Sequence, residues 1–370
     1  MDYKNRAKSE LQEKLCNQNG KHIVVGLDGF VDTILHLVAK RHGLGEDFDR
    51  IGTIESFGNR ILAASGKSTN IEMFPKMDKL GGNGPILANA MVSAGYPVRY
   101  IGSLGEPNIH PIFQAFADKT NAISISAPGL TNAIEFTDGK VMMGITKTLE
   151  EISYDSIIRK MGEQAFVDEL AQSTLLALVN WTMIPNMTQI FKDLLDKVLP
   201  DLAPISGGRS FFFDLADPEK RADEELKEAL ELISTFEKHG SVIVGLNLKE
   251  GQRVCEVLGI DEAGEELESL KRMTTKIRSA LNINAVVVHP KERAACATAD
   301  GAWCVEGPYV QNPVITTGAG DHFNAGFCSA QQLELSPEAC LTVGVCFSGH
   351  YVRTAKSPSL NDIDTFLGNW

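Results

Sequence analysis

Short apolar runs recur along the chain and alternate with longer amphipathic stretches. The clearest runs lie at residues 22–27, 175–179, 210–213, 241–246 and 285–288. Continuous runs of this kind are typical of strands that are buried on both faces of a parallel sheet. Between two of them, residues 217–239 carry apolar side chains at helical spacing among charges. The alternation predicts an α/β fold in which helices cover both faces of a parallel sheet.

One segment breaks this alternation. Residues 131–137 and 140–146 flank Asp138 and Gly139, a dipeptide typical of two-residue hairpin turns. The pattern therefore predicts an antiparallel hairpin.

Size, charge and cysteine spacing narrow the class of protein. A chain of 370 residues with 43% hydrophobic content can form one large domain with a smaller appendage. The formal charge of −13 argues against a nucleic acid or an anionic membrane as the main partner and favours a small-molecule substrate. The seven cysteines include no C-x-x-C pair, so neither a zinc site nor a disulfide framework is expected. Residues 1–20 lack the apolar core of a signal peptide and no run of about 18 apolar residues occurs, so we expect a soluble cytoplasmic protein.

Residues 316–327, with the sequence TTGAGDHFNAGF, combine small residues with a carboxylate at the start of an apolar helix. Gly318, Ala319 and Gly320 allow a tight turn that directs N–H groups outward, and the positive end of the helix dipole adds to their attraction for an anion. Asp321 follows directly, and a carboxylate beside an anion site is suited to accept a hydroxyl proton during phosphoryl transfer. The alternative is a glycine-rich turn in which Asp321 only caps the helix.

This segment resembles the second signature of the ribokinase-like (PfkB) carbohydrate kinases, in which a G-A-G-D run carries the anion hole and the catalytic aspartate. Residues 80–90, LGGNGPILANA, followed by Gly95 and residues 101–105, resemble the first signature of that family. Residues 247–250, NLKE, match its N-x-x-E motif. The three matches occur in order and extend over most of the chain.

The resemblance implies a single ribokinase-like kinase domain over residues 1–370, built as a three-layer α/β/α sandwich with a small β-sheet lid. We assign the lid to parts of residues 33–60 and 125–147; the alternative for the hairpin is a plain surface feature. Lid strands in this family can pair across a dimer, so a homodimer is one expected assembly.

The resemblance also implies residues that bind the acceptor. Asp32 matches an aspartate that binds sugar hydroxyls, and a carboxylate can accept two such hydrogen bonds. Gly81 and Gly82 would let the backbone approach a ligand closely, and Asn83 offers a donor and an acceptor to hydroxyls. Asp28, like Asp32, follows the strand predicted at residues 22–27 and is a further candidate. The alternative for both aspartates is a helix cap or a solvated turn, and for the two glycines a helix cap.

Asn247 and Glu250 match residues that order Mg²⁺ and phosphate through water, in agreement with the preference of Mg²⁺ for oxygen ligands and retained waters. The alternative for Glu250 is a favourable interaction with a helix N-terminus. Asp214 ends a strand and is either structural or helps to order the phosphate region. ATP is the implied phosphoryl donor. Ile315 replaces an acidic residue that opens the second signature, so activation by a monovalent cation stays open.

Four positions depart from the family pattern: Phe30, Ile86, His289 and Ile315. The acceptor is therefore left open among hexoses, pentoses, sugar acids and nucleosides. The run at residues 81–89 also resembles ADP-dependent sugar kinases, and the departures leave a noncatalytic sensor of sugar or nucleotide as a third hypothesis. A nicotinamide dehydrogenase is disfavoured, because residues 26–29 do not continue into G-x-G-x-x-G.

Overall fold

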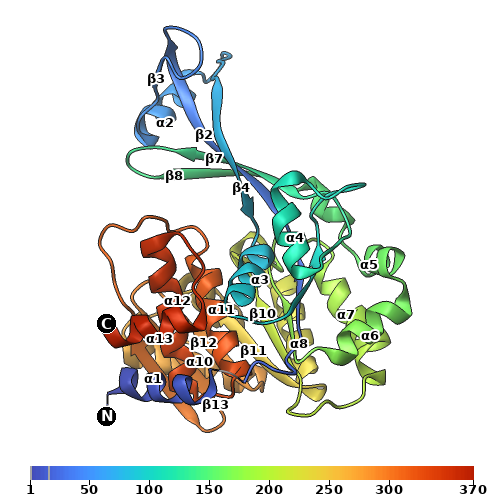
Figure 1. Ribbon diagram of the computed structural model, residues 1–370. Helices are drawn as coiled ribbons and strands as arrows, with labels where there is room; N and C mark the ends of the chain where they lie inside the picture. Colours follow the sequence, from blue (N-terminus) through green and yellow to red (C-terminus); the bar gives the residue numbers. More distant parts are fainter. Residues whose placement is uncertain (1, 16) are drawn as a thin grey trace.

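The computed structural model describes residues 2–15 and 17–370, and in this part of the chain it contains two sheets (Figure 1). The larger sheet has nine strands in the order β14-β13-β12-β11-β10-β9-β1-β5-β6. Their bounds are β1 Ile23–Leu27, β5 Val98–Gly102, β6 Ile123–Ser124, β9 Leu175–Leu178, β10 Ser210–Asp214, β11 Ser241–Leu246, β12 Ala285–Val288, β13 Arg293–Thr298 and β14 Gly301–Glu306. The strands from β6 to β12 pair in parallel, and β13 and β14 add an antiparallel edge.

The five apolar runs predicted as strands all lie in this sheet, as β1, β9, β10, β11 and β12. The helix predicted over residues 217–239 is wrong in its extent. A short turn of 3-10 helix at Pro218–Lys220 precedes α8, Asp223–Thr235, and another at Phe236–Lys238 follows it. The break has a local cause, because Ala216 and Asp217 have φ values of 55° and 57° and Pro218 follows them, so the chain enters α8 from a left-handed turn.

Helices form a layer on each face of the larger sheet (Figure 1). One layer contains α1 Tyr3–Lys14, α3 Asn83–Ser93, α4 Gln114–Thr120, α11 Ala319–Gln332, α12 Pro337–Thr354 and α13 Leu360–Asn369. The other contains α5 Tyr154–Met161, α6 Glu163–Gln172, α7 Met187–Lys197, α8, α9 Leu248–Leu258 and α10 Leu267–Leu281. The remaining short turns of helix are Pro111–Phe113, Lys147–Glu151 and Leu199–Asp201. The predicted three-layer α/β/α architecture is confirmed.

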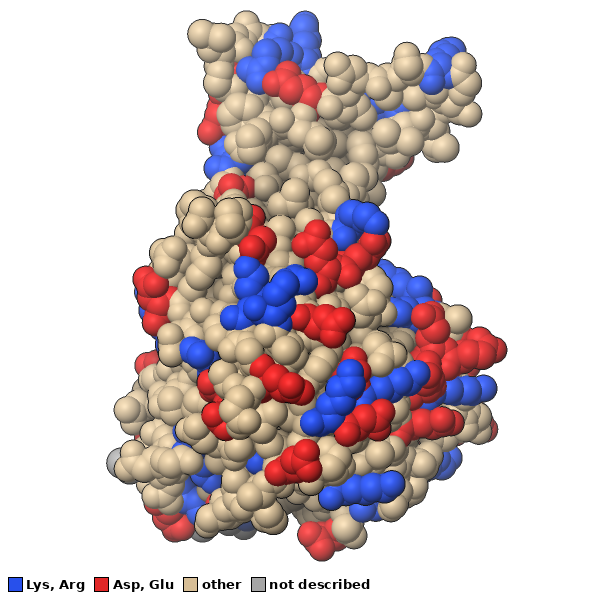
Figure 2. Space-filling model, turned by 90° about the vertical axis from the view of Figure 1, so that its right-hand side faces the viewer, with Lys and Arg blue, Asp and Glu red and all other residues tan. Residues whose placement is uncertain are grey.

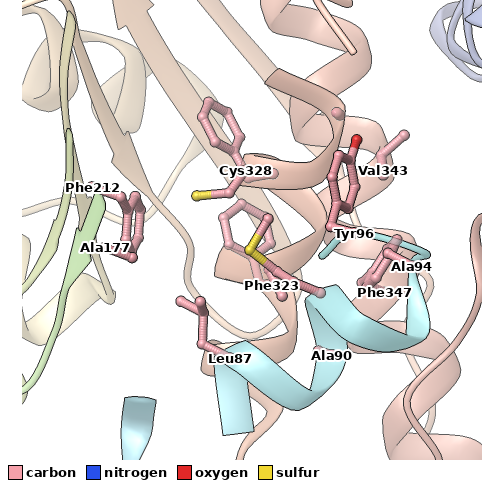
Figure 3. Close-up of a cluster of buried hydrophobic side chains, with 14 of the residues drawn as sticks. Leu87, Ala90, Ala94, Tyr96, Ala177, Phe212, Phe323, Cys328, Val343 and Phe347 are labelled. Carbon is pink, nitrogen blue, oxygen red and sulfur yellow. The ribbon is translucent and has the colours of Figure 1, made fainter. Parts of the chain in front are cut away.

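Strand residues divide between the two layers because successive side chains point to opposite faces. On β10, Phe212 belongs to the core under α3 and α11, whereas Phe211 and Phe213 belong to the core on the other face. Figure 3 shows the first of these cores, with Leu87 of α3 and Phe323 of α11 facing Phe212. Helix α1 buries Leu11 in this core and packs against α12 and α13.

The smaller sheet projects from one end of the molecule and stands above the main body (Figures 1 and 2). Its strand order is β3-β2-β7-β8, and β4 pairs with β2. Their bounds are β2 Phe30–Arg41, β3 Phe48–Arg50, β4 Met73–Gly81, β7 Gly129–Glu135 and β8 Lys140–Ile145, with α2 Ile54–Ala63 against one face. The sheet draws on the two segments assigned to a lid and also on β4, which the sequence analysis did not assign. On the face in Figure 2, acidic and basic side chains are interspersed.

The predicted hairpin forms between β7 and β8, and its last strand pair is Glu135 with Lys140. The turn is displaced by one residue from the one predicted, because Phe136 N donates to Gly139 O at 2.9 Å and residues 137 and 138 form the tip. Phe136 belongs to the small core beneath α2, where its ring stacks on Phe57 with centroids 5.6 Å apart. Burial of this aromatic ring favours the observed register over one with Asp138 and Gly139 at the tip.

The two sheets meet where β1 ends and β2 begins, and polar residues follow the larger sheet's strands at this edge. Asp28 follows β1, Asp214 ends β10 and Asn247 follows β11. Since these strands are parallel, their carboxyl ends lie at one edge, the usual position of ligand sites in open α/β sheets. None of the helices in the described ranges is long and apolar enough to cross a bilayer.

Candidate active site

Asp321 lies in the first turn of α11, directly after the glycine-rich turn. Gly318 caps the helix with φ 88°, and a Cβ there would come within 3.3 Å of Ile86, so the turn favours glycine. Ala319 N donates to Thr316 O at 3.2 Å, whereas no partner for the amides of Gly318 and Gly320 occurs in the described chain. Of the three residues predicted to form an anion hole, two therefore present unengaged N–H groups.

The Asp321 side chain is 8% exposed, and this burial raises its pKa to about 8. The hydrogen bond from Asn83 acts in the opposite direction, because it stabilises the ionised carboxylate. In that bond, Asn83 Nδ2 donates to Asp321 Oδ1 at 2.9 Å. Asn83 is the first residue of α3, so the two sequence signatures meet where the N-termini of α3 and α11 face each other.

The Asp28 side chain does not line a cavity that a ligand could enter, which corrects the prediction that Asp28 binds the substrate. The side chain is fully buried, and its two oxygens accept bonds from Asn83 N at 2.9 Å, Gly84 N at 2.8 Å and Asn180 Nδ2 at 2.6 Å. Burial raises its pKa to about 6 despite these bonds. Asp28 therefore acts as the cap that fixes the start of α3, and so fixes Asn83.

Asp32 lies on β2 of the small sheet and faces a cavity of about 380 Å³ between that sheet and α3, which we call the acceptor-side cavity. A Cβ on Gly81 would overlap the Asp32 carboxylate, so a larger residue at this position would displace the Asp32 side chain from its place in the cavity. Gly82, the N-cap of α3, has φ 101°. Partial burial raises the pKa of Asp32, while a bond with Thr131 lowers it.

A second cavity, of about 450 Å³, lies on the other side of the glycine-rich turn, and we call it the donor-side cavity. Its polar end is lined by Asn83, Asp214, Asn247, Glu250 and Asp321. Its other end is largely apolar and is lined by Pro290, Pro308, Tyr309, Val310, Pro313 and Val352, with Lys291 nearby. The turn separates the cavities, because Thr316, Ala319 and Gly320 line this one and Thr317 lines the acceptor-side cavity.

Three carboxylates gather at the polar end of the donor-side cavity: Asp214, Glu250 and Asp321. Burial and then the charges of Glu250 and Asp321 raise the pKa of Asp214 well above its ordinary value. Burial also raises the pKa of Glu250. Neutral carboxyls are favoured here because burial and the repulsion between neighbouring carboxylates both penalise the ionised forms, and a bound cation would reverse that balance.

Asn247 and Glu250 form a capping box at the start of α9. Glu250 N donates to Asn247 Oδ1 at 3.0 Å and Asn247 N donates to Glu250 Oε2 at 2.8 Å, while Asp217 N donates to Glu250 Oε1. Among the described residues, no three His, Cys, Asp or Glu side chains converge to bind a metal directly. The buried Oδ1 of Asp214 has no hydrogen-bond partner, so an acceptor is available to a hydrated ion. The donor set fits Mg²⁺ held largely through water and phosphate.

Several residues that shape the site were missed or set aside by sequence reasoning. Asn180 follows β9 and holds Asp28; its position after an apolar run was the available signal. The sequence assigns no role to His322, yet it is 2% exposed and its ring stacks on Tyr351 with centroids 3.6 Å apart. Its Nδ1 bonds Gly318 O at 2.7 Å, and Tyr351 Oη donates to Thr317 O at 3.0 Å. The stacked pair therefore holds the glycine-rich turn.

The contacts of His322 fix its tautomer. Gly318 O can only accept, so Nδ1 carries the proton and Nε2 accepts from Ser357 Oγ at 2.9 Å. Burial lowers the pKa of His322 to about 4, so the ring is neutral near pH 7. His322 therefore positions the turn and does not serve as a second base.

Comparisons with known proteins agree with this geometry. A model of the family described as "Prokaryotic ketohexokinase" matches residues 2–370. The ketohexokinase of Haloferax volcanii is 25% identical over 368 residues, which cover 99% of this chain and 96% of that protein.

Solved structures of sugar kinases share the fold. The fructokinase of Xylella fastidiosa with bound ATP aligns with a TM-score of 0.66 and 12% identity, covering 95% of this chain and 99% of that one. The ribokinase of Arabidopsis thaliana, complexed with ribose and ATP, aligns with a TM-score of 0.62 and 16% identity, covering 94% and 98%.

Proposed function

Since the chain belongs to the prokaryotic ketohexokinase family, and so is a sugar kinase of ribokinase type, we propose that it transfers a phosphoryl group from ATP to a hydroxyl of a ketohexose, with Asp321 as the general base. The observation that carries the proposal is the position of Asp321. It lines the donor-side cavity directly after the glycine-rich turn that separates this cavity from the acceptor-side cavity, at the N-termini of two helices, and it accepts a hydrogen bond from Asn83.

In the proposed reaction, the acceptor hydroxyl loses its proton to Asp321 as its oxygen forms a bond to the transferred phosphorus and the donor's bridging P–O bond breaks. The base must be ionised before it can accept that proton, so its raised pKa makes the free enzyme most active above about pH 8. Asn83 favours the ionised state through its hydrogen bond and also holds the carboxylate in one orientation.

The amides of Gly318 and Gly320 and the positive end of α11 would stabilise the charge on the transferred phosphoryl group. His322 and Tyr351 keep these amides aligned by fixing the carbonyls of the same turn. Asn247 and Glu250 would hold hydrated Mg²⁺, with Asp214 nearby, and Mg²⁺ would neutralise charge on the donor phosphates.

On the acceptor side, Asp32 would accept hydrogen bonds from sugar hydroxyls. It is the one carboxylate among the described residues that line this cavity, whereas Lys79, Lys119, Lys140 and Lys356 supply positive charge at its edge. The small sheet forms one wall of the cavity, so its movement toward the main body would exclude water from the reacting groups. Parts of residues 33–60 and 125–147 would thus act as a lid together with β4.

The function is tested with a coupled kinase assay on fructose, ribose, sugar acids and nucleosides, using ATP and ADP as separate donors with Mg²⁺ present. We expect turnover of a ketohexose with ATP and its loss, by orders of magnitude, in Asp321→Asn. Turnover with ADP alone would assign the enzyme to the ADP-dependent sugar kinases. Near-normal turnover of Asp321→Asn would reject Asp321 as the base, and binding without turnover of any acceptor would favour a sensor.

We further propose that two copies associate through the small sheet. Support comes from an apolar row on the face of β7 and β8 that points away from the acceptor-side cavity, where Leu130, Met143 and Ile145 are exposed. Strand β8 also lies at the edge of the sheet order, where a second sheet edge can pair. Light scattering should give a dimer mass that falls to the monomer mass in Ile145→Lys; a monomeric wild type would refute the association.

A further inference from the structure

A smaller cavity, of about 280 Å³, lies at the opposite end of the larger sheet from the active site, and we call it the basal cavity. It forms where the chain enters β10 and β11, beside Arg209 and Gly240. Strand β10 runs from Ser210 at this end to Asp214 at the donor-side cavity. Four steps of about 3.3 Å along a strand separate the two ends by roughly 13 Å, so one small ligand does not occupy both.

The charged residues that line the basal cavity are all basic or titrate to a cation. They are Arg209, Lys238 and His239, and the described lining includes no aspartate or glutamate. This is unexpected for a chain with a formal charge of −13, in which a carboxylate would be readily available to balance the cavity.

Arg209 is the most informative of the three, because it is only 6% exposed. Its Nε donates to Ser173 O and its Nη2 to Ala171 O, both at 3.2 Å. No bond of its Nη1 and no ion pair of its guanidinium occurs with any residue that the structure describes. Buried guanidinium groups are ordinarily paired with an anion, and burial lowers the pKa of Arg209.

Two glutamates close to the cavity are committed to other partners. Both Val242 N, at 2.9 Å, and Asn284 N, at 2.8 Å, donate to Oε2 of Glu237, which precedes Lys238. Glu334 approaches Gly207 but pairs with Lys21 at 3.4 Å. The electrostatics of the basal cavity therefore call for an anion that the chain itself does not supply.

We propose that the basal cavity binds a small phosphate-bearing metabolite, with Arg209 and Lys238 holding the phosphate. Arg209 offers a planar donor group suited to phosphate oxygens, and Lys238 adds a mobile ammonium at the rim. Pro200, Leu202 and Ile205 form an apolar wall on the other side, which suits the carbon skeleton of an organic phosphate better than a free ion.

The test is hydrogen–deuterium exchange of the full chain with inorganic phosphate, ribose 5-phosphate or ribose at millimolar concentration. The method locates binding, so protection at the basal cavity is separated from protection at the glycine-rich turn. We expect both phosphates, but not ribose, to protect peptides that cover residues 199–210 and 236–242. Tighter binding of ribose 5-phosphate would identify an organic phosphate, whereas equal binding would identify free phosphate as the ligand.

Variants at the rim keep the test independent of folding, because Lys238 is exposed. Lys238→Met should weaken the protection about tenfold, the loss expected for one charge-assisted bond, and Lys238→Glu should abolish it. Lys227→Glu, an exposed lysine of α8, is the matched control and should behave as wild type. Protection only at residues 316–320, no protection by either phosphate, or protection unchanged in Lys238→Glu would each overturn the proposal. The experiment does not measure kinase activity, so its result on phosphate binding at the basal cavity is independent of whether the proposed reaction is correct.

Discussion

Asn83 and Asp321 are 238 positions apart in the sequence and are joined by a 2.9 Å hydrogen bond from the amide of the first to the carboxylate of the second. The bond joins the N-termini of α3 and α11. It also connects Asp321 to Asp28, because Asp28 accepts the backbone N–H of Asn83. A largely buried chain of polar contacts therefore extends from the end of β1 to the Asp321 carboxylate.

Removing the Asn83 amide should shift the pH profile. In Asn83→Ala, the ionised form of Asp321 loses a stabilising bond, so the pKa rises further above about 8 and activity below that pH falls. We expect kcat/KM near pH 7 to fall by about tenfold or more. The measurement is kcat/KM against pH, with Asn361→Ala of α13, an exposed asparagine, as the control. Coincident profiles for wild type and Asn83→Ala would contradict the role of the bond.

Asp321→Asn should stabilise the protein at alkaline pH while it abolishes turnover. The folded-state pKa of about 8 exceeds the ordinary value of 3.8, so the folded state holds a proton that the unfolded chain releases. Stability is therefore lost as the pH rises from about 4 to about 8. An asparagine does not ionise. Above that pH window the free energy of unfolding of the variant should therefore exceed that of the wild type by on the order of a few kcal/mol, and below the window the two should be equal. Thermal unfolding at both ends of the window checks this, and an equal Tm difference at the two pH values would disprove it.

Asp32→Asn should weaken acceptor binding. If the carboxylate accepts sugar hydroxyls, its loss should raise the KM for the sugar about tenfold, with the KM for ATP unchanged. Asp78→Asn is the matched control, because Asp78 pairs with Thr33 on the opposite face of the same sheet. Initial-rate kinetics with each substrate varied in turn provide the measurement. An equal rise in both variants would mean that the sheet is perturbed generally and that Asp32 is not a ligand.

Glu250→Gln should increase the requirement for Mg²⁺. A glutamine keeps the size of the side chain but removes a negative charge beside Asp214 and Asp321, so we expect the half-saturating Mg²⁺ concentration to rise by about tenfold. Glu256→Gln on the same helix loses only an exposed pair with Arg253 and should titrate as wild type. Thermal unfolding of both variants verifies that α9 remains folded. Identical Mg²⁺ titrations of the wild type and Glu250→Gln would contradict the proposed role of Glu250 in holding Mg²⁺.

Tyr351→Phe should lower turnover without weakening the fold. The substitution keeps the ring stacked on His322 but removes the hydroxyl that bonds Thr317 O. The glycine-rich turn would then be held by His322 alone, so we expect kcat to fall about tenfold with little change in either KM. Tyr309→Phe, an exposed tyrosine of the donor-side cavity, controls for loss of a hydroxyl. A change confined to KM would show that Tyr351 contacts substrate instead.

The sequence alone was sufficient for features that depend on local pattern. Continuous apolar runs predicted the parallel strands, because a strand buried on both faces has little room for polar side chains. The glycine-rich turn before Asp321 was also visible, since tight turns at helix N-termini need residues of low steric demand. The hairpin turn was predicted one residue away from its position after Phe136, because the burial of that ring against Phe57 is a long-range contact.

Tertiary structure decided which polar residues face the two cavities. Asp28 and Asp32 lie in the same short stretch, yet Asp28 is fully buried under α3 and Asp32 faces the acceptor-side cavity. His322 and Arg209 gave no local signal, because the role of each depends on partners far away in the sequence, Tyr351 and Ser357 for His322 and Ser173 for Arg209. Local pattern fixes strands and turns through short-range sterics and hydrophobic burial, whereas the environment of a charge is fixed only when distant segments pack around it.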